Sequence, residues 1–209
     1  MTIAEMRAAL GLGPEVSDAE VADLYATSII GAAVAPPAAE PVTFTQAAAQ
    51  MRLGDDASEQ ALVEGYITAA REWVEDYTGH IVVQRLITDQ FSAFAPRLYL
   101  TKRPVVEVTG ISYTDAAGTA ASFAGFRLGF DRTRAHVSPA AGCWPRLAAH
   151  GSVAVTYLAG YADGEVPQRI RQAILLATAD FYKNRTPFLS AEAERAIAWL
   201  LRGLRRRVL

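Results

Sequence analysis

Histidine and cysteine are the side chains that most often carry acid–base, nucleophilic or metal chemistry, and this chain has few of them. Its three histidines, His80, His136 and His150, are far apart in sequence. None stands in a spacing such as His-Glu-x-x-His, which places two metal ligands on one helix face. Cys143 would need a nearby base to act as a nucleophile, whereas its neighbour Trp144 favours a packed loop with the cysteine as a small apolar filler. We expect neither a metal site nor a catalytic cysteine.

Paired carboxylates are the second kind of candidate, because two such groups can perform general acid–base catalysis. Asp55 and Asp56 stand before an expected helix, where the macrodipole favours negative charge. Glu72, Glu75 and Asp76 fall opposite the apolar stripe of that helix, which predicts that they are solvated. Capping and solvation therefore explain these carboxylates better than catalysis.

Glycine pairs are the third candidate, since glycine-rich loops bind phosphates. Gly125 with Gly129 and Gly160 with Gly164 lack both the Gly-Lys-Ser/Thr ending and the strand-to-helix Gly-x-Gly-x-x-Gly pattern. They are expected in turns. The sequence thus predicts no cofactor and no enzymatic activity.

Basic residues at the end of the chain are the one charged feature with functional promise. Residues 1–80 carry 13 acids and 3 bases, whereas residues 166–209 carry 3 acids and 9 bases. Four arginines within Arg202–Arg207 are able to contact nucleic-acid phosphates, an anionic protein surface or only water. One reading is therefore a nucleic-acid-binding module that uses this arginine cluster. The acidic remainder of the chain argues against it, because it would repel a polyanion.

Length and composition limit the class of protein. With 209 residues, 51% of them apolar, the chain can build a substantial core. The single cysteine cannot form an intramolecular disulfide, which favours the cytosol. No run of 18 apolar residues is present, and the first residues lack the pattern of a signal peptide. We expect a soluble protein with no membrane partner.

Helical spacing marks both ends of the sequence. Residues 2–10 and 17–27 indicate two short helices, and the prolines of 32–42 indicate a linker. Further helices are predicted from Thr43 or Thr45 to Leu53, from 58 to 78, from 167 to 184 and from 191 to 207. In the 58–78 helix, the apolar stripe is expected to be Leu62, Tyr66, Ala69, Trp73 and Tyr77, with Gly79 as a left-handed cap. The 167–184 helix has its own stripe of Ile170, Ala173, Ile174, Ala177 and Phe181.

Between these helices the period changes to that of strands. Segments 81–91, 97–100, 105–113, 126–130 and 153–158 are rich in Val, Ile, Tyr and Phe and are separated by turn residues. The sequence therefore predicts an α+β fold, mainly a helical bundle with a small antiparallel β element inserted between the long helices.

Three separated segments, considered together, resemble the head–tail connector (adaptor) proteins of tailed bacteriophages, the gp6-like family, including the adaptors of gene transfer agents. The first is Ala69–His80, a helix that ends in Tyr-Thr-Gly and leads into a strand. The second, Leu98–Val108, contains the Lys-Arg-Pro-Val-Val run, and Ile111–Asp115 follows it. The third covers Val153–Tyr161, Val166–Leu176 and Phe181–Arg185. The resemblance covers about residues 43–205, whereas residues 1–41 depart from the family pattern.

The resemblance implies a structural protein of a phage or phage-like particle. Such an adaptor forms a homo-oligomeric, dodecameric ring beneath the portal, joins the DNA-filled head to stopper and tail proteins, and extends the channel through which packaged DNA passes. It would be assembled in the bacterial cytoplasm and reside in the virion neck. The implied division is an N-terminal helical extension (1–31), an Ala/Pro linker (32–42), a connector core domain (43–190) and a C-terminal basic amphipathic helix for portal docking (191–209).

The family's C-terminal helix inserts against the portal, which assigns a portal interface on this chain. The expected interface residues are Trp199, Leu200, Arg202, Leu204, Arg205, Arg206 and Arg207. Trp199 and Leu204 are the anchor candidates because large apolar side chains dominate interface energetics. An intramolecular core role for the same two residues is an almost equal alternative.

Overall fold

The computed structural model describes residues 29–53, 57–131, 134–148, 151–186 and 188–204. They form two compact units, each assembled from separate stretches of chain. The β unit contains residues 29–35, Leu86–Thr101 and Val105–Leu158, and the helical unit contains Pro36–Arg85, Lys102–Pro104 and residues 159–204. Among the helices in these ranges, none combines the length and apolar character needed to cross a bilayer.

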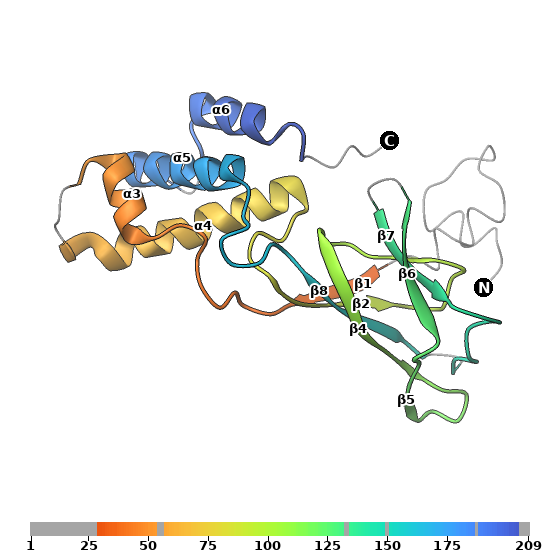
Figure 1. Cartoon of the computed structure of the whole chain (residues 1–209). Helices are drawn as coiled ribbons and strands as arrows, with labels where there is room; N and C mark the ends of the chain where they lie inside the picture. The colour runs from red at the N-terminus through yellow and green to blue at the C-terminus, as the bar shows by residue number, and fades with distance from the viewer. Residues whose placement is uncertain (1–28, 54–56, 132–133, 149–150, 187, 205–209) are drawn as a thin grey trace. The chain divides into compact units, whose positions relative to one another are not determined.

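The helical unit contains α3 (Phe44–Met51), a 3₁₀ turn (Ala57–Glu59), α4 (Gln60–Thr78), α5 (Gln168–Asn184) and α6 (Ala191–Leu201). Local capping explains several boundaries. Thr43 begins α3 with a reciprocal capping box to Gln46, and Ser190 caps α6 by accepting from the amide of Ala193. Gly79 ends α4 in the left-handed conformation, with φ of 69°, so this predicted cap is confirmed. Figure 1 shows α5 lying between α4 and α6.

The core of the helical unit confirms one predicted stripe and corrects another. All five predicted positions on α5 are buried, from Ile170 to Phe181. On α4, however, the buried apolar residues are Val63, Ile67, Ala70 and Val74. The predicted stripe on α4 is wrong, since Leu62 is 41% exposed. Two apolar stripes run side by side along this helix, and helical spacing alone cannot decide which one faces α5.

The β unit consists of two antiparallel sheets. The larger has the strand order β1 (Ile29–Val34), β2 (Arg85–Phe91), β8 (Val153–Ala159), β4 (Val105–Thr114) and β5 (Ala120–Ser122). The smaller has the order β3 (Leu98–Tyr99), β7 (Arg134–Pro139) and β6 (Phe126–Asp131). Alternate residues of β2 and β8 are fully buried, including Ile87, Phe91 and Tyr157. Each of these two strands therefore turns one face to the core.

The prediction of a mainly helical bundle with a small β element is wrong. The described residues are 35% helical and 30% strand, and they hold four helices and eight strands. Three strands were not predicted, β1, β5 and β7. β5 is Ala-Ala-Ser, and β7 carries a histidine and a proline, so pairing with neighbouring strands decides their conformation. β1 contains two isoleucines and a valine, but it spans the boundary between the predicted extension and the predicted linker.

The N-terminal residues are described only from residue 29 onward. The predicted helices at 2–10 and 17–27 lie outside the described residues. Residues 29–34, which the sequence interpretation divides between extension and linker, form β1 and pair antiparallel with β2. Within the stretch that follows, Val42 is 2% exposed. The Nε of Arg71 also donates to Glu40 at 2.8 Å, so this stretch packs within the helical unit.

Candidate functional site

The two histidines that the structure describes belong to different units. His80 is buried in the helical unit, where its Nδ1 lies 3.0 Å from the Tyr161 hydroxyl. Burial and then the charge of Arg103 lower its pKa to about 4, so the ring is neutral at pH 7. His136 belongs to the β unit, and desolvation lowers its pKa as well. His150 lies outside the described residues.

No metal site can be built from the residues that the structure describes, because no three histidine, cysteine or carboxylate side chains gather suitably. Cys143 is exposed, so its expected role as a buried filler is wrong. The neighbouring Trp144 is the packed residue of this loop: its Nε1 donates to the carbonyl of Ala95 at 2.6 Å, and its ring stacks on Phe94.

The carboxylates of α4 also differ from expectation. Glu72 is exposed, as predicted. Glu75 is 5% exposed, so its predicted solvation is wrong. Its carboxylate accepts from Arg71 at 3.1 Å, from Arg85 at 2.6 Å and from the amide of Val82 at 2.8 Å. A fully engaged carboxylate of this kind stabilises the fold and is not available to a substrate. Asp55 and Asp56 lie outside the described residues.

The predicted portal interface divides into an inner and an outer face of α6. On the inner side, Ile197 and Leu201 are fully buried, and Leu200 and Leu204 pack half-buried against the same core. On the outer side, Trp199 is 65% exposed. Of the two anchor candidates, Leu204 therefore contacts its own chain, whereas Trp199 has its surface free for a partner.

Arginine accompanies the exposed tryptophan. The guanidinium of Arg202 lies over the Trp199 ring, 5.3 Å from its centroid. This is a cation–π contact that leaves a flat, basic and apolar surface on the outer side of α6. Arg205, Arg206 and Arg207 lie outside the described residues.

Both ends of α6 are fastened to the helical unit. At its start, Asp180 accepts from the amide and the hydroxyl of Ser190, at 2.8 and 2.7 Å. At its end, Arg103 donates to the carbonyls of Leu204 and Thr78, at 2.6 and 3.0 Å. No local sequence pattern predicts these contacts, because the partners are up to 101 residues apart. They fix the direction in which Trp199 points.

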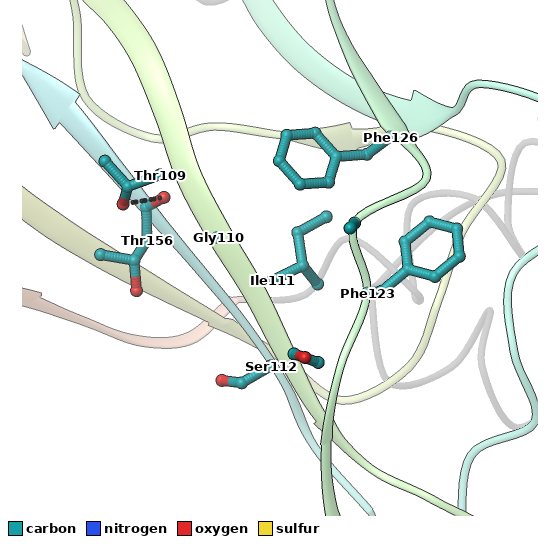
Figure 2. Close-up of a pocket in the computed structure, with 9 residues that line it drawn as sticks. Thr109, Gly110, Ile111, Ser112, Phe123, Phe126 and Thr156 are labelled. Carbon is teal, nitrogen blue, oxygen red and sulfur yellow. Dashed lines mark hydrogen bonds between the residues drawn. The ribbon is translucent and has the colours of Figure 1, made fainter.

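The β unit contains an apolar pocket of about 490 Å³ beside β4. Figure 2 shows the side chain of Ile111 directed toward the rings of Phe123 and Phe126. Thr109 also lines the pocket, and its hydroxyl donates to the Thr156 carbonyl at 3.0 Å. The lining residues carry hydroxyls and apolar groups but no ionisable side chain. The pocket therefore suits an apolar side chain of a partner, and it offers no acid, base or nucleophile of catalytic strength.

A second apolar groove, of about 540 Å³, lies between α4 and α5 in the helical unit. Its floor is formed by three small residues of α4, Ala61, Gly65 and Ala69, and Tyr66 and Trp73 stand beside them. This groove follows the α4 stripe that the sequence predicted to be buried. Leu62 and Ala69 of that stripe are exposed, whereas Tyr66, Trp73 and Tyr77 are partly buried against the core.

Comparison with solved structures shows where this fold occurs. A chain of the neck of an empty gene transfer agent particle, computed with C6 symmetry, matches with a TM-score of 0.75 and 23% identity, over 86% of this chain and 98% of that chain. A chain of the virion of a native particle matches with a TM-score of 0.72 and 24% identity, over 86% and 98%.

A chain of the neck of a native particle, computed with C12 symmetry, matches with a TM-score of 0.66 and 26% identity, over 85% and 97%. This chain has the fold of a gene transfer agent neck protein. The resemblance inferred from the sequence segments is thereby confirmed at the level of the fold. The neck-protein fold includes both units, since the matches cover nearly all of each neck chain. No family model matches the sequence, and no curated protein matches it.

Proposed function

We propose that this protein is a structural head–tail connector (adaptor) in the neck of a tailed phage or gene transfer agent particle. The observation that carries the proposal is the match to almost the whole length of neck chains, 97–98% of each. The function is assembly and not chemistry.

In this proposal, copies of the chain form a dodecameric ring beneath the portal and extend the channel for packaged DNA. Stopper or tail proteins bind the other side of the ring, and assembly takes place in the bacterial cytoplasm. Support for a ring comes from the two necks computed with C6 and C12 symmetry. A ring of this kind needs two different, complementary surfaces on each copy.

The proposed portal-facing surface is the outer side of α6 with the basic tail that follows it. Trp199 supplies apolar area and Arg202, with Arg205–Arg207, supplies positive charge. Leu200 and Leu204 contribute indirectly, since they hold the helix against its own unit. An exposed tryptophan beside an arginine has the composition typical of interface hot spots.

The test is portal binding by full-length variants. Trp199→Ala is expected to weaken binding to the cognate portal about tenfold or more, because truncating a hot-spot tryptophan costs about 2 kcal/mol or more. Its thermal midpoint should remain that of the wild type, since the side chain is 65% exposed. Truncation after Ser190 is less informative because it would also delete the buried Ile197 and Leu201.

Glu194→Gln is the matched control, because Glu194 is exposed on the same helix but about 140° around its axis from Trp199. This variant should bind the portal like the wild type. Wild-type affinity in Trp199→Ala would show that the outer face of α6 is not the portal interface.

A further inference from the structure

The larger sheet of the β unit leaves two strand edges open. In the described part of the chain, no strand pairs with the outer edge of β1. At the other side of the sheet, β5 pairs only with Ser112–Thr114 of β4. The preceding residues Val105–Gly110 of β4 therefore also have an edge that no described strand covers. Uncovered edges are ready sites for pairing with another chain.

Apart from a register shift between Ile29 and Gly31 at the start of β1, neither edge carries the usual protection against such pairing. The β1 sequence Ile-Ile-Gly-Ala-Ala-Val has no charge and no proline. The open stretch of β4 is Val-Val-Glu-Val-Thr-Gly, with a single charge. Exposed β-branched residues lie on both strands, since Val34 is 41% and Val106 is 50% exposed. Natural sheets normally place lysine, proline or bulges at edges that must remain free.

We propose that neighbouring copies of this chain join their larger sheets edge to edge, with β1 of one copy pairing antiparallel with Val105–Gly110 of the next. The occupant of each open edge is a second copy of the same chain. This inference rests on the proposed ring, and it names the two different surfaces that a cyclic contact requires.

The lengths and directions of the two edges agree. β1 has six residues, as does Val105–Gly110. The sheet is antiparallel throughout, so β1 and β4, three steps apart in the order β1-β2-β8-β4, run in opposite directions. A neighbour whose sheet continues the same order therefore presents its β1 antiparallel to β4. From Gly31 onward β1 pairs regularly with β2, and this register places Val34 opposite Val105 and Gly31 opposite Val108.

The hydrogen-bonding groups agree with that register. The amide of Ala35 donates inward to Leu86. Because amide direction alternates along a strand, Ala32 and Val34 must point to the open edge. On β4, the carbonyl of Ile111 accepts from Phe123 on the outer side, so Val105, Glu107 and Thr109 point outward. The register pairs outward residues with outward residues: Val34 with Val105 and Ala32 with Glu107.

The faces of the sheet and the position of the apolar pocket are also consistent with this pairing register. Val34 lies opposite the buried Ile87 of β2, and Val105 shares a face with the buried Ile111 of β4. The joined strands would thus continue one core face. The same register brings the start of the neighbour's β1 beside the pocket lined by Ile111, Phe123 and Phe126 (Figure 2). An open edge with an adjoining apolar pocket is the arrangement used in β-strand addition.

Cysteine cross-linking of the full-length ring assembled on its cognate portal tests the pairing. In a Cys143→Ser background, Ala33→Cys and Val106→Cys would face each other as a non-hydrogen-bonded pair, with Cα atoms about 4.5 Å apart. This distance permits a disulfide. Oxidation should give a ladder of covalent multimers in a denaturing gel. The control variant combines Ala33→Cys with Arg127→Cys, because Arg127 is exposed on β6 of the other sheet. This control should give no ladder of multimers.

A pair of proline variants supplies an independent readout. Ala32→Pro removes an outward amide and should abolish ring formation while leaving the thermal midpoint of the monomer nearly unchanged. Ala33→Pro removes an amide that bonds to β2 and should lower that midpoint. The edge pairing alone would be overturned if the Ala32→Pro variant still formed a ring. It would also be overturned if the ring of the Ala33→Cys, Val106→Cys variant gave no more cross-linked multimers than the control. If the wild type forms no ring on the portal, the proposed function fails and the pairing fails with it.

Discussion

The buried ion cluster of the helical unit permits a quantitative test of the fold. Glu75 faces Arg71 and Arg85, whose side chains are 4% and 6% exposed. Glu40 is a second counter-charge for Arg71, whereas the ion pair of Arg85 is with Glu75. Glu75→Gln keeps the shape of the side chain but leaves a buried guanidinium without its carboxylate. Removing one partner of a buried pair costs about 3–5 kcal/mol.

The expected loss is measurable by urea and thermal unfolding followed by far-ultraviolet circular dichroism. For a chain of this size, each kcal/mol lowers the thermal midpoint by about 2–4 °C, so Glu75→Gln should lower it by roughly 6–20 °C. Glu72→Gln is the matched control, since Glu72 lies 3.5 Å from Arg71 with a side chain 62% exposed; it should change stability by less than about 0.5 kcal/mol. A loss below about 1 kcal/mol in Glu75→Gln would show that the Glu75 carboxylate is not needed to balance the buried guanidinium groups.

Three further outcomes are expected. The pKa of His80 is held at about 4 in the fold, against 6.5 when unfolded. About 3 kcal/mol of stability that is present above pH 6.5 is therefore lost as the pH falls to 4. In thermal scans from pH 4 to 7, His80→Gln should flatten this pH dependence, and an unchanged slope would contradict the expectation. Gly160→Ala should destabilise by about 2 kcal/mol or more in urea titrations, because φ is +113° and a Cβ would lie 2.7 Å from the backbone of Gln84. Gly65→Ala, which meets nothing within 4 Å on α4, should instead stabilise by about 0.5–1 kcal/mol in the same titrations.

Local sequence patterns predicted the features that depend on local physics. The α5 stripe from Ile170 to Phe181 was predictable because a single apolar face runs along that helix. The cap at Gly79 was predictable because glycine adopts positive φ without steric cost. On α4 the same reasoning chose the wrong stripe, since residues 62 and 63 both begin apolar runs at helical spacing.

Features that depend on distant partners were not predictable from one sequence. Glu75 is buried only because Arg85, ten residues away, reaches back to it. β1 is a strand only because β2 pairs with it. For the candidate portal interface, composition indicated α6 as a whole. Only the way that α6 packs on its core shows that Trp199 is exposed and that Leu204 is packed. Sequence patterns thus located the segment, and the tertiary contacts decided which residues a partner can reach.

The proposed function can be tested by electron microscopy of the full-length protein mixed with its cognate portal. We expect a dodecameric ring on the portal, coaxial with its channel, with the outer face of α6 directed at the portal. Portal particles that carry no added ring density, under conditions in which both proteins are folded and in excess, would contradict it.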